Sequence, residues 1–316
     1  MPRSRKAGWL WEFFLLFLMS VLLLTGCVPA RQAGSREFRS VTDYTNTEVR
    51  VPVHPERVVS LGVSTDDILV PVLGPERIAA IADLPPNYPE EAARIKGRVS
   101  MSTESVMACQ PDLVVAADWA SPDFIQELRT LDIPVYVYRT PTTWEGAVAR
   151  IYELSGVVNE PEKGARLAED SIGRMERLKS FLSSIPREKR LIAAYDTTLG
   201  FSGGAGSTFD ELCRGAWLRN GLAEAGLGAN DTASREMALK VDPQIIFIPS
   251  DAYDKGTYKA LTESQIYSDP ALSGMNAVKN KKVFVIDARW IMSTSQFMVR
   301  AMEEMAADAY GYKPEA

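Results

Sequence analysis

The segment that decides the fold reads Ser102-Thr103-Glu104-Ser105-Val106-Met107-Ala108-Cys109-Gln110-Pro111-Asp112-Leu113-Val114-Val115. The same pattern returns as Ser234-Arg235-Glu236-Met237-Ala238-Leu239-Lys240-Val241-Asp242-Pro243-Gln244-Ile245-Ile246-Phe247. Each copy offers a serine that suits a helix N-cap, a glutamate where the helix dipole favours an anion, and a proline that ends the helix. The apolar run that follows predicts a buried strand. One unit used in both halves predicts two lobes of similar design, although each glutamate alone also fits simple helix-end electrostatics.

Strand-like and helix-like segments alternate on both sides of these two copies. Strands are predicted at 58–61, 78–81, 113–116 and 135–138, and again at 190–195, 245–248 and 282–286. An edge hairpin with its turn near Asn46 is expected before them. This alternation predicts parallel sheets with helices on both faces. The fold class is therefore α/β, with two Rossmann-like lobes.

The stretch from 143 to 186 is helical in pattern, with a short interruption near 156–161. Apolar residues recur at helical spacing between Leu167 and Leu182, with charges between them. We predict one long rigid helix that joins the lobes. The expected divisions are a signal peptide (1–26), a flexible tether (27–40), the first lobe (41–142), the connecting helix (143–186) and the second lobe (187–316).

The N-terminus has the pattern of an export signal. Arg3, Arg5 and Lys6 precede an apolar run that is too short for a comfortable membrane span. Small residues then precede Cys27, as in a bacterial lipobox, where the cysteine is lipidated and becomes the first residue of the mature chain. We expect a lipid anchor at Cys27, with a plain signal peptide or an uncleaved anchor as the alternatives.

Composition excludes several classes of function. The chain has 316 residues, a net charge of −6 and a pI near 5.2, which argues against a nucleic-acid partner. Because the chain has a single histidine, His54, zinc sites and histidine-based acyl transfer are nearly excluded as functions. Cys109 and Cys213 fall in different predicted lobes and are expected to be separate buried thiols.

Taken together, these pieces resemble the ABC-importer substrate-binding proteins that serve ferric siderophores, haem and cobalamin. The pieces are the lipobox, the hairpin that begins Val41-Thr42-Asp43, the run Pro55-Glu56-Arg57-Val58-Val59-Ser60-Leu61, both repeated segments, the bridging helix, and Lys281-Lys282-Val283-Phe284-Val285-Ile286-Asp287. The resemblance implies a ligand cleft between two lobes joined by a rigid helix. It also implies that Glu104 and Glu236 dock onto arginines of a membrane permease, which works with an ATPase. The protein is then expected outside the cytoplasm, beside the membrane that holds its lipid anchor.

Candidate ligand residues follow from where parallel strands end, since ligands meet the carboxyl ends of the strands in such lobes. The aromatic and cationic residues there are Tyr88, Trp119, Arg139, Phe201, Tyr253, Arg289 and Trp290. Aromatic walls with a few cations suit a chelated or flat organic ligand. Tyr88 and Tyr253 remain possible iron ligands, whereas His54 precedes its strand and lies at the wrong end for an axial ligand.

The first hypothesis is a capture protein for a ferric-siderophore-type chelate, followed by cobalamin and haem on the same scaffold. A lipid-anchored enzyme is disfavoured because His54 is misplaced and no Gly-x-Ser-x-Gly elbow is present. The Gly203–Thr208 loop lacks the lysine of a phosphate-binding loop, and we interpret it as part of the cleft wall. No catalytic residue, resident cofactor or protein-held metal is expected.

Overall fold

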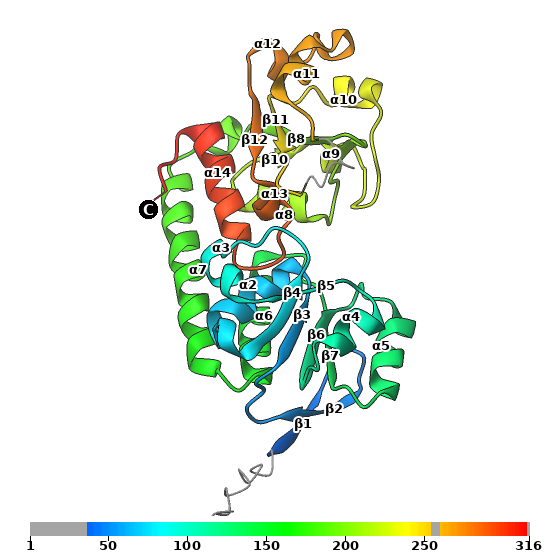
Figure 1. Cartoon of the computed structure of the whole chain (residues 1–316). Helices are drawn as coiled ribbons and strands as arrows, with labels where there is room; N and C mark the ends of the chain where they lie inside the picture. The colour runs from blue at the N-terminus through cyan, green and yellow to red at the C-terminus, as the bar shows by residue number, and fades with distance from the viewer. Residues whose placement is uncertain (1–36, 254–259, 315–316) are drawn as a thin grey trace, which may run out of the picture. The chain divides into compact units, whose positions relative to one another are not determined.

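The computed structural model describes residues 37–253 and 260–314, whose course is drawn in Figure 1. The first lobe contains a parallel sheet in the order β5-β4-β3-β6-β7. Its strands are β3 (Val58–Leu61), β4 (Ile78–Ala82), β5 (Gly97–Val99), β6 (Leu113–Ala117) and β7 (Val135–Tyr138). Its helices are α2 (Val63–Leu73), α3 (Pro89–Arg94), α4 (Thr103–Ala108) and α5 (Pro122–Thr130), with a 3-10 turn at Pro75–Arg77.

The second lobe has a similar sheet in the order β10-β8-β11-β12, and one short strand, β9, pairs antiparallel with β8. Its strands are β8 (Ile192–Thr197), β9 (Gly200–Ser202), β10 (Arg219–Asn220), β11 (Ile245–Pro249) and β12 (Val283–Ile286). Its helices are α8 (Thr208–Gly215), α9 (Gly221–Glu224), α10 (Arg235–Val241), α11 (Glu263–Ser268), α12 (Asn276–Lys279), α13 (Ala288–Ile291) and α14 (Met298–Tyr310), with 3-10 turns at Arg187–Lys189 and Pro270–Leu272.

Both sheets are buried on both faces, and the strand after each repeated segment shows this most clearly. Leu113 and Val115 of β6 belong to one apolar core, whereas Val114 and Ala116 belong to the core on the opposite face. Alternate residues of a strand point to opposite faces, so an uninterrupted apolar run fits a sheet covered on both sides. β11 repeats the arrangement in the second lobe. The prediction of two parallel-rich α/β lobes is therefore confirmed.

The prediction of one connecting helix is wrong in detail, because the stretch forms two helices. α6 (Trp144–Val157) and α7 (Pro161–Leu182) pack against each other. Asn159, with φ of 58°, makes the turn, and Pro161 opens α7 because its missing amide costs nothing in the first turn. A Cβ on Gly164 of α7 would lie 2.0 Å from the Ser155 Oγ of α6, so only glycine permits this close packing.

The pair of helices still forms a stiff connection. Ile151 and Ala168 contribute to the core of the first lobe, whereas Trp144 and Leu178 contribute to a core of the second lobe. Each helix is therefore packed into both lobes, and one end cannot move without disturbing the other core. In Figure 1, α7 is drawn in green and α14, which packs against it, in red.

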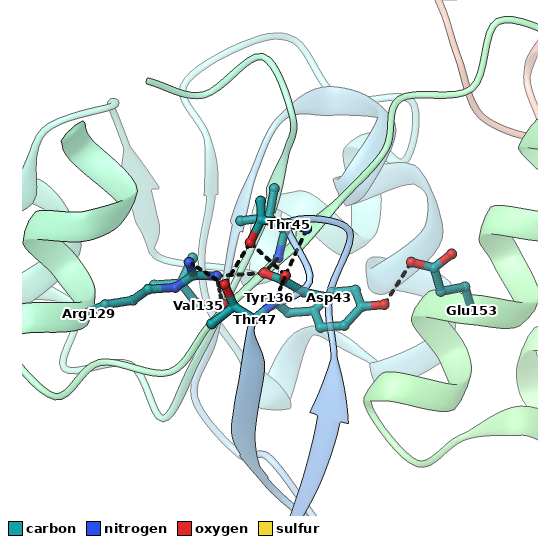
Figure 2. A network of polar contacts seen from close by, with 8 residues as sticks. Asp43, Thr45, Thr47, Arg129, Val135, Tyr136 and Glu153 are labelled. Atoms are coloured by element: carbon teal, nitrogen blue, oxygen red, sulfur yellow. Dashed lines mark hydrogen bonds and ion pairs between the residues drawn. The ribbon is translucent and has the colours of Figure 1, made fainter. Parts of the chain in front are cut away.

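A buried carboxylate holds the N-terminal hairpin to the first lobe. The hairpin consists of β1 (Phe38–Thr42) and β2 (Glu48–Pro52), so residues 38–40 belong to a strand and not to the predicted tether. The carboxylate of Asp43 accepts hydrogen bonds from Thr45, from the Thr47 amide and from the Val137 amide, and its Oδ2 lies 2.5 Å from Arg129 Nη2. Figure 2 shows Asp43 between the hairpin turn and Arg129.

We expect Asp43→Ala to lower the free energy of unfolding by about 3–5 kcal/mol, because it leaves the half-buried Arg129 without its partner and several amides without an acceptor. Glu48→Ala, at an exposed position of β2, is the control. Urea unfolding at neutral pH measures both. A loss for Asp43→Ala no larger than that for Glu48→Ala would show that this carboxylate does not hold the hairpin.

Several predictions concern residues outside the described part of the chain. The signal peptide, Cys27 and the beginning of the tether precede residue 37. Within the described residues, no helix is both long enough and apolar enough to cross a membrane. Cys109 and Cys213 are unpaired thiols, and the second is buried while the first is partly exposed.

Candidate ligand-binding cleft

The two repeated segments begin their helices in the same way. The Oγ of Ser102 accepts a hydrogen bond from the Ser105 amide at 3.2 Å before α4. The Oγ of Ser234 accepts one from the Met237 amide at 3.3 Å before α10. Both serines are therefore N-caps, as predicted, and each satisfies an amide that the first helical turn leaves without a partner.

The helices also end alike. The sequence analysis attributed both ends to proline alone, but the residue before each proline also has a left-handed backbone conformation. Gln110 and Asp242 have φ values of 47° and 49° and stand directly before Pro111 and Pro243. Left-handed backbone reverses the chain after each helix, and a residue before proline is already discouraged from continuing a helix. The equivalence of the two segments thus extends to individual backbone angles.

Both glutamates of these segments are exposed. Glu104 and Glu236 each occupy the first turn of a helix, two residues after the N-cap serine. A hydrogen bond with Ser234 lowers the pKa of Glu236, which keeps this carboxylate charged. Each lobe consequently presents an acidic group to solvent at a matching position.

At the carboxyl ends of the first lobe's strands lies a cavity of about 280 Å³. Its lining residues are Leu61, Gly62, Ala82, Asp83, Leu84, Val99, Ser100, Met101 and Trp119. Trp119 follows β6 and is 58% exposed. A Cβ on Gly62 would lie 3.3 Å from the Trp119 ring, so this glycine leaves room for the indole. A large, solvent-facing aromatic surface beside an apolar hollow is suited to a flat organic ligand.

The two lobes meet through polar contacts beside this strand edge. Ser64, in the first turn of α2, accepts a hydrogen bond from the Thr294 amide at 3.1 Å. One residue on, the Ser295 hydroxyl donates to Asp67 Oδ2 at 2.7 Å, and Asn87 donates to Asp67 Oδ1 at 3.0 Å. The loop before α14 is therefore joined to the first turns of α2.

Burial dominates the chemistry of Asp67 and of its neighbour Asp66. Asp67 is 1% exposed, and burial raises its pKa to about 7, although the hydrogen bonds from Ser295 and Asn87 act in the opposite direction. Burial also raises the pKa of the adjacent Asp66 well above its ordinary value. A carboxyl that is neutral in the folded protein can donate a hydrogen bond as well as accept one.

A second cavity, of about 230 Å³, lies between α7 and the start of α14. Its lining residues are Asn87, Tyr88, Leu167, Asp170, Ser171, Arg174, Arg289, Trp290, Gln296, Phe297, Val299 and Arg300. The structure therefore brings together three of the predicted ligand residues, Tyr88, Arg289 and Trp290. The guanidinium of Arg289 is held by Asp287, at 2.5 Å, and donates across the lobes to the Pro86 carbonyl at 3.2 Å.

The remaining candidates are more scattered. Tyr253 is half-buried. Burial is the main cause that raises its pKa, and the nearby charges of Asp67 and Asp287 raise the pKa further. Arg139 is exposed at the end of β7, where its guanidinium lies 5.7 Å from the centre of the Tyr44 ring. It lines neither of the two cavities described above.

The prediction for Phe201 disagrees with the structure. Phe201 is 1% exposed and belongs to an apolar core with Ala194 and Ile246. It lies on β9, an antiparallel strand that the sequence analysis did not predict, and its ring packs into the core beside β8. We remove it from the ligand residues.

Two further findings concern metals and missed residues. Within 37–253 and 260–314, no group of three or more His, Cys, Asp or Glu is placed to hold a metal ion. The phenols of Tyr88 and Tyr253 would act as iron ligands only as individual groups. The sequence analysis missed Asp67 and Gln296, and the available signal was two adjacent acids, Asp66 and Asp67, in the first turns of an otherwise apolar helix.

Comparison with known proteins agrees with this architecture. An uncharacterized ABC transporter substrate-binding lipoprotein, YvrC of Bacillus subtilis (strain 168), is 23% identical over 97% of this chain and 98% of its own length. A vitamin B12-binding protein of Vibrio campbellii is 30% identical over 39% of this chain and 46% of its own.

Among solved structures, the apo form of the periplasmic haem-binding protein RhuT from Roseiflexus sp. RS-1 has a TM-score of 0.69 at 16% identity. The match covers 81% of this chain and 98% of that one. At this identity the likeness concerns the fold. The family model described as periplasmic binding protein matches residues 58–290, which span both sheets and the connecting helices. The chain therefore belongs to the periplasmic binding protein family.

Proposed function

We propose that this chain is the substrate-binding component of an ABC importer, that it captures a ferric-siderophore-type chelate, and that it delivers the chelate to the membrane permease. The observation that carries the importer function is the pair of exposed glutamates, Glu104 and Glu236, on helices that match in their caps and ends. A contact charged at two points orients a partner and speeds encounter, even where each ion pair adds little affinity. In this role the chain binds and releases its ligand without catalysing a reaction.

The proposed location is outside the cytoplasm, with the mature chain lipid-anchored through Cys27. The anchor would hold the capture domain beside the permease and raise its local concentration. The related Bacillus protein is named a lipoprotein, which supports this part of the proposal.

The ligand class rests mainly on Trp119 and the apolar cavity beside it. We propose that Trp119 stacks on the ligand and that Tyr88, Arg289, Trp290 and Tyr253 contact its polar or anionic groups. Arg139 is retained as a peripheral contact for a ligand larger than either cavity. A corrin or a porphyrin would also stack on Trp119, and relatives named for vitamin B12 and haem keep cobalamin and haem as alternatives.

A ligand titration tests this proposal. We expect intrinsic tryptophan fluorescence to change on addition of a ferric siderophore, and Trp119→Ala to weaken binding about tenfold or more through loss of aromatic contact area. Tyr152→Ala, which removes another exposed aromatic side chain, is the control. Binding of cyanocobalamin or haemin in place of the siderophores would select an alternative ligand. Failure of all three classes to bind would contradict the proposed cargo.

A further inference from the structure

An exposed apolar side chain accompanies each of the two exposed glutamates. Met107 is 46% exposed and stands three residues after Glu104; Leu239 is 37% exposed and stands three residues after Glu236. Residues three apart are neighbours on a helix surface, so each carboxylate has an apolar group beside it. Met107 and Leu239 occupy the same place in the two repeated segments.

The core does not need these two side chains. The inward positions of the same helices are filled by Val106 and Ala238, which are 0% and 1% exposed and again occupy matching places. Met107 and Leu239 belong to none of the four apolar cores. A single exposed apolar residue needs no explanation, but the same combination of acid and apolar group on both lobes does.

More apolar surface surrounds the same two helices. Met101, directly before the cap of α4 and also at the edge of the cavity beside Trp119, is 42% exposed, and Met237 of α10 is 36% exposed. Methionine is flexible and polarizable, and it adapts to the shape of a partner. Of the four large exposed apolar side chains named here, Met101, Met107 and Met237 are methionines.

We infer that Met107 and Leu239, with Glu104 and Glu236, form a paired docking surface for the membrane permease. Each carboxylate meets a cationic side chain of the permease, and the apolar side chain one turn later enters an apolar socket beside that cation. This inference rests on the proposed importer function and adds the residues that hold the complex together. Exposed ion pairs contribute little net affinity, whereas buried apolar contacts at the centre of an interface contribute most of it.

The negative charge of this docking surface favours the permease, and not a second copy of this chain, as the partner that covers it. A contact between two copies through this surface would bring carboxylates together on a chain that already carries a net charge of −6. Like charges placed opposite each other suppress association. A partner with cations beside apolar sockets satisfies both parts of the surface.

The separate contributions of the apolar residues and the glutamates to permease binding can be measured. Binding of the full chain to its cognate permease and ATPase, reconstituted in lipid nanodiscs, is followed by surface plasmon resonance. We expect the double variant Met107→Gln with Leu239→Gln to dissociate roughly ten- to thirtyfold faster, with little change in association rate. This effect should persist between about 0.05 and 1 M salt, because screening acts on charges and not on apolar contacts.

Two matched variants make the result specific. Glu104→Gln with Glu236→Gln should slow association, and the effect should fade in high salt. Leu131→Gln, which alters an apolar side chain that is 45% exposed elsewhere on the first lobe, should change neither rate. Because all these positions are exposed, thermal unfolding should stay within a few degrees of the wild type.

Three outcomes would overturn the inference. If the glutamate variants weaken binding and Met107→Gln with Leu239→Gln does not, the apolar contact is wrong while the importer function stands. If none of the variants weakens binding, docking through these helices is wrong as a whole. If sedimentation shows a dimer of the wild type that Met107→Gln with Leu239→Gln disrupts, the surface serves self-association.

Discussion

Replacing Glu104 and Glu236 together by lysine is expected to abolish uptake and to leave ligand affinity unchanged. Both side chains are exposed and neither lines a described cavity, so the cleft keeps its structure. In the proposed complex, each substitution turns an attractive contact with a cation of the permease into a repulsive one. Like charges facing each other across an interface cost several kcal/mol, so uptake should fall by about a hundredfold or more.

The matched control changes the net charge of the chain equally at other exposed positions. Glu169 and Glu176 lie on α7, and Glu169→Lys with Glu176→Lys adds the same positive charge without touching α4 or α10. Uptake of labelled ligand by cells, beside fluorescence titration of the purified variants, separates delivery from capture. Normal uptake by the Glu104→Lys, Glu236→Lys variant would remove the docking role from these residues.

Pattern in the sequence predicted the parts of the fold that depend on local rules. Serine caps, β-branched runs and their alternation with helices gave both sheets and the repeated segments, and the structure confirms these elements. The break in the connecting helix was visible as a short interruption. Its consequence was not predicted, because Asn159 and Pro161 reverse the chain only if the two helices can pack as closely as Gly164 allows.

The candidate site was less predictable, because its geometry depends on contacts between distant segments. Strand ends selected Tyr88, Arg289 and Trp290, which line one cavity, and Trp119, which lines another; their contact with a ligand stays a prediction. They selected Phe201 wrongly, because a short antiparallel strand looks like a loop in the sequence. The role of Asp67 was not predicted, because only its contact with Ser295, which is distant in the sequence, shows that it joins the lobes.

We expect Asp67 to contribute strongly to the change of protein stability with pH. Its pKa is about 7 in the folded protein, whereas an unfolded aspartate has a pKa near 4. Between these values the folded state keeps a proton that the unfolded state has lost. Stability therefore falls as the pH rises from about 4 to 7, with a total cost on the order of 4 kcal/mol above pH 7.

Asp67→Asn should remove this cost, because a neutral amide resembles the protonated carboxyl. The amide oxygen can still accept from Asn87, and the amide nitrogen can donate to the Ser295 hydroxyl, which also contacts Ser293. We expect the variant to be more stable than the wild type at pH 8. Its stability should also change less steeply with pH, by up to about 1.4 kcal/mol per pH unit.

Urea unfolding at several pH values between about 5 and 8 measures this slope. Asp123→Asn, which removes an exposed charge in the first turn of α5, is the control and should leave the slope unchanged. Some dependence should remain in Asp67→Asn, because burial also raises the pKa of Asp66. An unaltered slope, with lower stability at pH 8, would mean that Asp67 is ionised when folded. If the slope does flatten, ionisation of Asp67 opposes its burial between the lobes, although the hydrogen bond from Ser295 favours the charged form, and the folded state that holds the join loses stability as the pH rises.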